Sequence, residues 1–188
     1  MTIDDASIER LVQQARDGDT DAFGRLFDHY NKPIYRYIAS RVDHPSDAED
    51  LTQIVFVKTL EALPRYESRG IPFGGWLFRL ARNAVIDHLR TRREHADLDG
   101  LAERSAGGPG PDAVAVTNEE IGAMGAALGA LTDDQRDAIA LRFFAGLSAR
   151  EAAEAMGKQE GTVRGLQFRA IAALRRQLGI EEQQDIDA

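Results

Sequence analysis

The sequence predicts an all-α protein made of two small helical domains joined by a flexible linker. Three observations lead to this fold class. Apolar residues recur at three- and four-residue spacing along most of the chain, as on amphipathic helices. No segment alternates apolar and polar residues for long enough to predict a strand. One stretch rich in glycine and proline, residues 105–111, interrupts the helical pattern and can hold neither a helix nor a strand.

The first expected domain covers residues 1–95 and opens with two amphipathic segments. The first has an apolar face that ends at Asp17-Gly18-Asp19 and consists of Ile8, Leu11, Val12 and Ala15. The second carries Phe23, Leu26, Phe27 and Tyr30, and the residues after Pro33 are expected to continue it with a kink.

Three helix starts are predicted from capping boxes, in which Ser or Thr is followed three residues later by Glu or Gln. They begin at Ser46, Thr132 and Ser148. In the helix expected after Ser46, Leu51, Val55 and Leu60 are predicted to face inward. That orientation leaves Asp50, Gln53, Ile54 and Val57 on the outer face.

A further helix is expected from Phe73 to Arg90. Its predicted apolar face consists of Phe73, Trp76, Leu77, Leu80, Ala84 and Leu89. The opposite face presents Arg79, Arg82, Asn83, Ile86, Arg90 and Arg93. Asparagine is mildly unfavourable inside a helix, so Asn83 is a candidate for a functional role.

The second expected domain covers residues 116–180, after a linker at 96–115 and before a disordered acidic tail at 181–188. A helix capped by Ser148 is predicted to end at Gly157, and a second helix begins near Glu160. This spacing is typical of a helix-turn-helix, which inserts the start of its second helix into the DNA major groove. The residues available there are Thr162, Arg164, Gly165, Phe168 and Arg169.

The net charge of −8 hides two basic segments. Seven arginines and two acidic residues between Arg65 and Arg93 give +5, and residues 158–176 give +4. Basic segments in an acidic chain suit a protein that binds both DNA and another protein. The absence of cysteine excludes disulfides and thiolate sites, and the four histidines lack metal-ligand spacing, so no cofactor is expected. With no leader and no apolar run long enough to span a membrane, the expected location is the cytoplasm.

Residues 131–176 resemble the fourth conserved region of bacterial sigma factors, and residues 47–60 resemble the second region of their extracytoplasmic-function (ECF) group. The resemblance implies that Asp50, Gln53, Ile54 and Val57 bind the clamp helices of the largest RNA polymerase subunit. It also implies that residues 73–90 read the −10 promoter element, opened into single strands, with Tyr66, Arg79, Arg82, Asn83 and Arg90. The helix-turn-helix would read the duplex −35 element. The chain departs from the usual family pattern at Ile54, Leu166 and Gln167.

Two other functions compete with this interpretation. LuxR-type regulators share the helix-turn-helix pattern, so a regulator that binds duplex DNA alone, as a dimer, is the main alternative. A DNA-acting enzyme is disfavoured because the sequence contains no phosphate-binding glycine loop. The third region of larger sigma factors is missing, which favours the ECF group, and an anti-sigma factor is a possible further partner.

Overall fold

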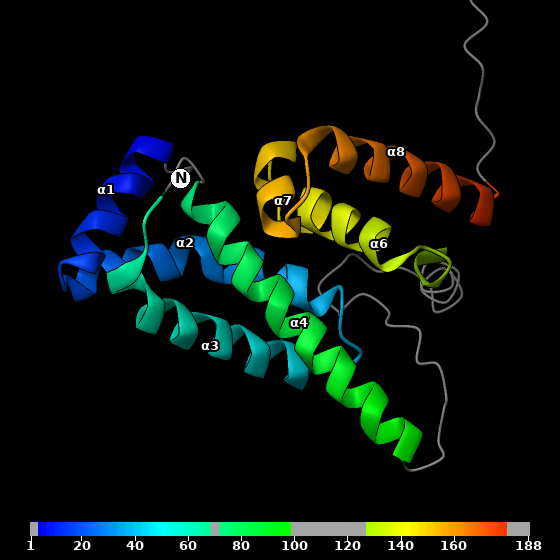
Figure 1. Cartoon of the computed structure of the whole chain (residues 1–188), viewed down its shortest axis with the longest axis horizontal. Coiled ribbons are helices and arrows are strands. Elements are labelled where there is room, and N and C mark those ends of the chain that lie inside the picture. The colour runs from blue at the N-terminus through cyan, green and yellow to red at the C-terminus, as the bar shows by residue number, and fades with distance from the viewer. Residues whose placement is uncertain (1–3, 69–71, 99–126, 180–188) are drawn as a thin grey trace, which may run out of the picture.

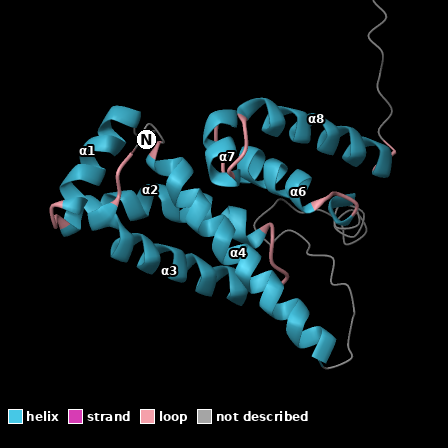
Figure 2. Cartoon of the chain, in the orientation of Figure 1, coloured by secondary structure: helices cyan, strands magenta, loops and turns pink. Residues whose placement is uncertain are grey.

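The residues that the structure describes form helices joined by loops. The computed structural model describes residues 4–68, 72–98 and 127–179. Its helices, labelled as in Figure 1, are α1 (Asp5–Arg16), α2 (Thr20–Ala39), α3 (Pro45–Ala62), η1 (Leu63–Arg65), α4 (Phe73–Leu98), α6 (Asp133–Ile139), η2 (Ala140–Phe144), α7 (Ala149–Met156) and α8 (Glu160–Gln177). Figure 2 shows only helices and loops in this part of the chain, which confirms the all-α class.

The expected linker and tail fall mostly outside the described residues. Helix α4 continues to Leu98, three residues past the expected end of the first domain at residue 95. The rest of the linker, residues 99–115, and the tail at 181–188 lie outside the described part of the chain.

Helices α1 and α2 form where the apolar spacing predicted them. The carboxylate of Asp4 caps α1 by accepting a hydrogen bond of 2.7 Å from the Ser7 amide. Helix α2 runs through Pro33 without ending, and Ile34, Tyr37 and Ile38 beyond it are all buried. The second half of α2 is therefore part of the core in spite of the proline.

The predicted start of α3 was wrong. The helix begins at Pro45, with His44 as its N-cap residue and no side-chain capping bond, so the expected capping box at Ser46 does not form. Proline suits the first helical position because its fixed φ matches the helix and its missing N–H would have no partner there. Ser46 consequently lies inside the first turn.

The predicted burial of Leu60 was also wrong. Leu51 and Val55 face the core as expected, but the Leu60 side chain is 56% exposed. At 100° per residue, Leu60 falls on the outer side of α3 with Val57, and Thr59 occupies the inward position. The buried Thr59 hydroxyl is satisfied because it donates to the Val55 carbonyl at 2.7 Å.

Helix α4 carries a second buried stripe that the sequence pattern did not reveal. Phe73, Leu77 and Ala84 are buried as predicted, and Trp76, Leu80 and Leu89 pack partly buried against the core. Phe78, Ala81 and Val85 are buried as well. The reason is that α4 contacts α2 and α3 of its own domain and also α7 of the second domain, so it is covered on more than one side.

The second domain forms the predicted helix-turn-helix. Both expected capping boxes are present, at Thr132 before α6 and at Ser148 before α7. Gly157 ends α7 with φ of +63°, the left-handed conformation that glycine adopts without strain. Between α6 and α7, η2 is a π-helical turn that is closed by a hydrogen bond from the Ala145 amide to the Ala140 carbonyl.

The two domains pack against each other. A single cluster of buried residues includes Leu77 and Phe78 of α4 together with Ala152 and Ala153 of α7. In Figure 1, α7 lies beside the N-terminal half of α4, and α6 and α8 extend away from it. Part of the α4 surface is therefore covered by the domain that carries the helix-turn-helix.

Candidate polymerase and nucleic-acid interfaces

The outer face of α3 is the candidate surface for binding the polymerase. All four residues expected there, Asp50, Gln53, Ile54 and Val57, are exposed. Ile54 is 43% exposed and Val57 is 56% exposed, and Leu60 extends the same face. Exposed apolar side chains bordered by polar ones are typical of a protein-binding site. Leu60 was missed here, although counting helical turns from Val57 would have placed it on this face.

The face of α4 expected to meet opened DNA is only partly available. Arg79, Asn83 and Arg90 are exposed. Arg90 lies 3.5 Å from Asp87 and 4.0 Å from Glu94 on its own helix. Exposed ion pairs of this kind are weak, so Arg90 can leave them to bind a phosphate. Arg82 is different, because its guanidinium contacts carboxylates of the second domain.

Tyr66 requires a correction. The expectation was a side chain that reaches DNA, but Tyr66 is 7% exposed and belongs to the core. Its ring centroid lies 4.7 Å from that of Trp76 and 5.5 Å from that of Phe73. Burial raises the pKa of the Tyr66 hydroxyl to about 12, with a smaller contribution from Glu9. Aromatic packing therefore fixes Tyr66 as support for the start of α4.

The start of α8 presents the residues expected to read duplex DNA. Thr162, Arg164, Phe168 and Arg169 are exposed, and Gly165 is half-buried between them. Phe168 is 75% exposed, so most of its ring is free to contact a binding partner. Arg164 pairs with Glu160 one turn earlier, at 2.6 Å. This geometry suits a helix that enters a major groove from its N-terminal end.

The two departures from the family pattern in α8 have structural roles. Leu166 is buried and belongs to the same core cluster as Ala152 and Met156 of α7. Gln167 accepts a hydrogen bond of 3.1 Å from Arg142, which also donates to the Leu147 carbonyl. Gln167 thus connects α8 to the turn before α7, a contact that sequence spacing could not reveal.

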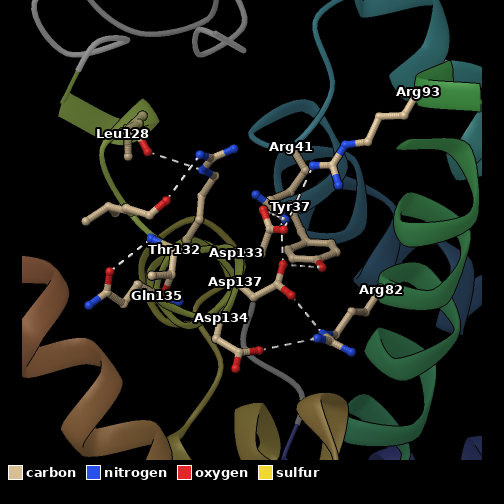
Figure 3. A network of polar contacts seen from close by, with 12 residues as sticks. Tyr37, Arg41, Arg82, Arg93, Leu128, Thr132, Asp133, Asp134, Gln135 and Asp137 are labelled. Carbon is tan, nitrogen blue, oxygen red and sulfur yellow. Dashed lines mark hydrogen bonds and ion pairs between the residues drawn. The ribbon is translucent and has the colours of Figure 1, made fainter. Parts of the chain in front are cut away.

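A network of charged side chains joins the two domains around Asp137 (Figure 3). Asp137 is 2% exposed and comes from α6. Its Oδ1 lies 2.9 Å from Arg41 Nε and accepts a hydrogen bond of 3.1 Å from the Tyr37 hydroxyl. Its Oδ2 accepts a hydrogen bond of 2.8 Å from Arg82 Nε. One carboxylate of the second domain therefore contacts three side chains of the first.

Two acidic residues nearer the surface, one exposed and one half-buried, extend this network. Asp134 lies 3.7 Å from Arg82, and Asp133 lies 4.0 Å from Arg41 and 3.9 Å from Arg93. Burial, and then the charge of Asp137, hold the pKa of the Tyr37 hydroxyl well above its usual value. Nothing in the sequence pattern links Asp137 to Arg41 or Arg82, because the contacting residues are far apart along the chain.

Comparison with known proteins identifies the family. Residues 26–95 match the family model for Sigma-70 region 2, and residues 127–176 match that for Sigma-70, region 4. The ECF RNA polymerase sigma factor BldN of Streptomyces coelicolor is 37% identical over 182 residues, which is 93% of this chain and 67% of BldN. The ECF sigma factor SigD of Mycobacterium tuberculosis is 33% identical over 181 residues, covering 93% of this chain and 85% of SigD. A solved structure of CnrH in complex with the cytosolic domain of CnrY is similar with a TM-score of 0.70 and 28% identity, over 90% of this chain and 95% of that one.

The matches to region 2 in the first domain and to region 4 in the second define the class of sigma-70-type transcription factors. Within that class, the chain belongs to the ECF RNA polymerase sigma factors. It binds RNA polymerase and directs promoter-specific initiation of transcription, as the resemblance implied. Within residues 4–68, 72–98 and 127–179, no helix is long and apolar enough to cross a membrane.

Proposed function

We propose that the outer face of α3 binds the clamp helices of the largest polymerase subunit. Asp50 and Gln53 supply polar contacts, and Ile54, Val57 and Leu60 supply apolar area. The exposure of three large apolar side chains on one helix face is the observation that supports this assignment. Ile54, where the family more often has Glu, makes this docking surface more apolar.

The two DNA-reading surfaces divide between the domains. Arg79, Arg82, Asn83 and Arg90 on α4 bind the opened −10 element, where an asparagine amide can bond base edges and arginines can bind phosphates. Thr162, Arg164, Gly165, Phe168 and Arg169 on α8 read the −35 duplex through phosphate and base-edge contacts.

The protein acts in the cytoplasm as a non-catalytic subunit of the polymerase, without a cofactor. An anti-sigma factor controls it. The similarity to the sigma factor RpoE of Bartonella quintana, which was solved in complex with the anti-sigma factor NepR, supports this regulation. That similarity has a TM-score of 0.70 at 27% identity and covers 85% of this chain and 98% of that one.

The docking surface is tested by changing Asp50 and Gln53 together to Ala. Both side chains are exposed, so each change is expected to cost under about 0.5 kcal/mol of stability. Gel filtration with core polymerase should show a complex for the unchanged protein and a weaker one for the double variant. A matched control is Asp28→Ala with Gln13→Ala, two exposed positions outside α3.

Unchanged polymerase affinity in a folded double variant contradicts the assignment of α3. Specific duplex binding at nanomolar affinity without polymerase favours the stand-alone regulator instead.

A further inference from the structure

Two arginines of the first domain converge on one carboxylate of the second. Arg41 lies in the turn after α2, Arg82 lies on α4, and Asp137 lies between them (Figure 3). The Arg41 side chain is 2% exposed and the Arg82 side chain is 19% exposed. The two guanidinium groups are therefore held close together in a site shielded from water.

The site resembles one built for a phosphate group. Each Asp137 oxygen lies within 3 Å of a different guanidinium, at 2.9 Å from Arg41 and 2.8 Å from Arg82. A phosphodiester also presents two anionic oxygens, and paired arginines are well suited to bind them. Arg41 retains unused capacity, because its buried Nη1 has no hydrogen-bond acceptor among the described residues. A larger anion with more oxygens could satisfy that donor.

Separation of the two domains would leave this pair of arginines without its carboxylates. Two like charges, one buried and one half-buried, need another anion or water when they lose their common counterion. Asn83, the residue assigned to opened DNA, is the next residue after Arg82 on α4. Their side chains point about 100° apart around the helix but only 1.5 Å apart along it, so a DNA strand bound at Asn83 passes within reach of the long Arg82 side chain.

We propose that Arg41 and Arg82 form a binding site for a backbone phosphodiester of single-stranded promoter DNA, which Asp137 occupies while the two domains are packed together. The proposal rests on the proposed −10 role of α4 and adds Arg41 to it. Asp133 and Asp134 reinforce the packed arrangement through longer ion pairs. The protein thereby masks its own single-strand reader until the domains separate.

The test variant is Asp137→Asn, which keeps the shape of the side chain and removes its charge. Asp28→Asn is the matched control, since it changes the net charge equally at an exposed position of α2. The natural chain contains no cysteine, so Lys32→Cys and Gln177→Cys can carry a dye pair, one in each domain. Energy transfer between the dyes reports domain separation, and anisotropy of a labelled oligothymidine reports single-strand binding.

Asp137→Asn should lower energy transfer and tighten oligothymidine binding, whereas Asp28→Asn should change neither. If nine in ten molecules are packed, releasing them increases affinity about tenfold. The salt dependence should steepen by about 0.7 for each added phosphate contact. Adding Arg41→Ala or Arg82→Ala to the Asp137→Asn variant should cancel the gain.

Three results would overturn the proposal. They are unchanged energy transfer in a folded Asp137→Asn variant, separation of the domains without tighter binding, and a gain that survives the arginine substitutions. If Asp137→Asn does not fold, Asp133→Asn with Asp134→Asn removes the longer ion pairs to the same two arginines, at positions nearer the surface, and should give a smaller gain of the same sign. If the protein starts transcription with core polymerase but fails these tests, only the proposed phosphodiester site is rejected. A protein that fails to bind polymerase loses the proposed function.

Discussion

At the scale of single residues, Asn83 should distinguish strand opening from duplex binding. Asn83→Ala removes an exposed amide on α4 that is expected to bond a base of the opened −10 strand. Binding to the closed promoter should remain nearly intact, while permanganate reactivity of the promoter thymines falls. A template with a pre-melted bubble should not fully rescue the variant, because the lost contact is to the single strand.

Arg169→Ala is the complementary change on α8. It should weaken closed-promoter binding by about 1–3 kcal/mol and do so only on templates with the −35 sequence. Filter binding on matched templates measures this loss. Equal weakening of closed binding by both variants, with opening unchanged, would falsify the single-strand role of Asn83.

Tyr37 should make stability depend on pH in the alkaline range. Burial, and then Asp137, raise the pKa of its hydroxyl well above the usual value of 10.0 in the folded protein. The neutral form is therefore favoured by folding, so this contribution is complete below pH 10 and is lost as the pH rises toward the folded pKa. Urea unfolding at about pH 9 and about pH 11 should show a decrease in the free energy of unfolding that is smaller in Tyr37→Phe. An identical decrease in both proteins contradicts the assignment.

Helical spacing predicted which candidate site residues are exposed in most cases, but it did not predict their partners. The exposed positions on α3 and α8 follow from a residue's angle around the helix, which is a local property. Arg82 was predicted to face outward for the same reason, and its side chain does point away from the core of its own domain, toward Asp137 of the second domain. Its pairing with Asp137 depends on how two helices from different domains meet, and no local pattern contains that information.

At the scale of elements, the three predicted capping boxes had different outcomes. Those at Thr132 and Ser148 form, whereas the one at Ser46 does not. In α3 a proline stands directly before the serine and takes the first helical position. The capping-box rule therefore failed at Ser46 because the proline before it sets the start of the helix.

This difference between Ser148 and Ser46 predicts different costs for the same substitution. Ser148→Ala removes a hydrogen bond to the Glu151 amide and should cost about 1 kcal/mol of stability. Ser46→Ala removes no capping bond and should stay within about 0.5 kcal/mol. Urea denaturation of both variants, followed by circular dichroism, measures the two values. Equal losses would mean that Ser46 caps α3 in solution.

At the scale of the whole molecule, the packing of the two domains was not predicted. The glycine- and proline-rich linker suggested independent units, and each domain has its own amphipathic helices. The second stripe on α4, with Phe78, Ala81 and Val85, was the available signal. A helix with apolar residues over more than one face needs more than one neighbour, and that criterion could have indicated an interdomain contact.

Because one buried cluster joins both domains, the protein should unfold in a single transition. Trp76, the only tryptophan, reports on the first domain, while circular dichroism reports on the helices of both. The two signals should coincide in urea for the natural protein and separate for Asp137→Asn. Two separate transitions in the natural protein would show that the interdomain contact is too weak to couple the domains.

The role of Asp137 also predicts an unusual phenotype for mutations in its codon. Asparagine and glycine codons each differ from those of aspartate by one base, so the carboxylate that joins the domains is easily lost. Most substitutions in a folded domain either change its stability little or lower it, but these two should raise the output of its target genes in the absence of a stimulus. A selection for constitutive expression should therefore recover dominant alleles at this codon.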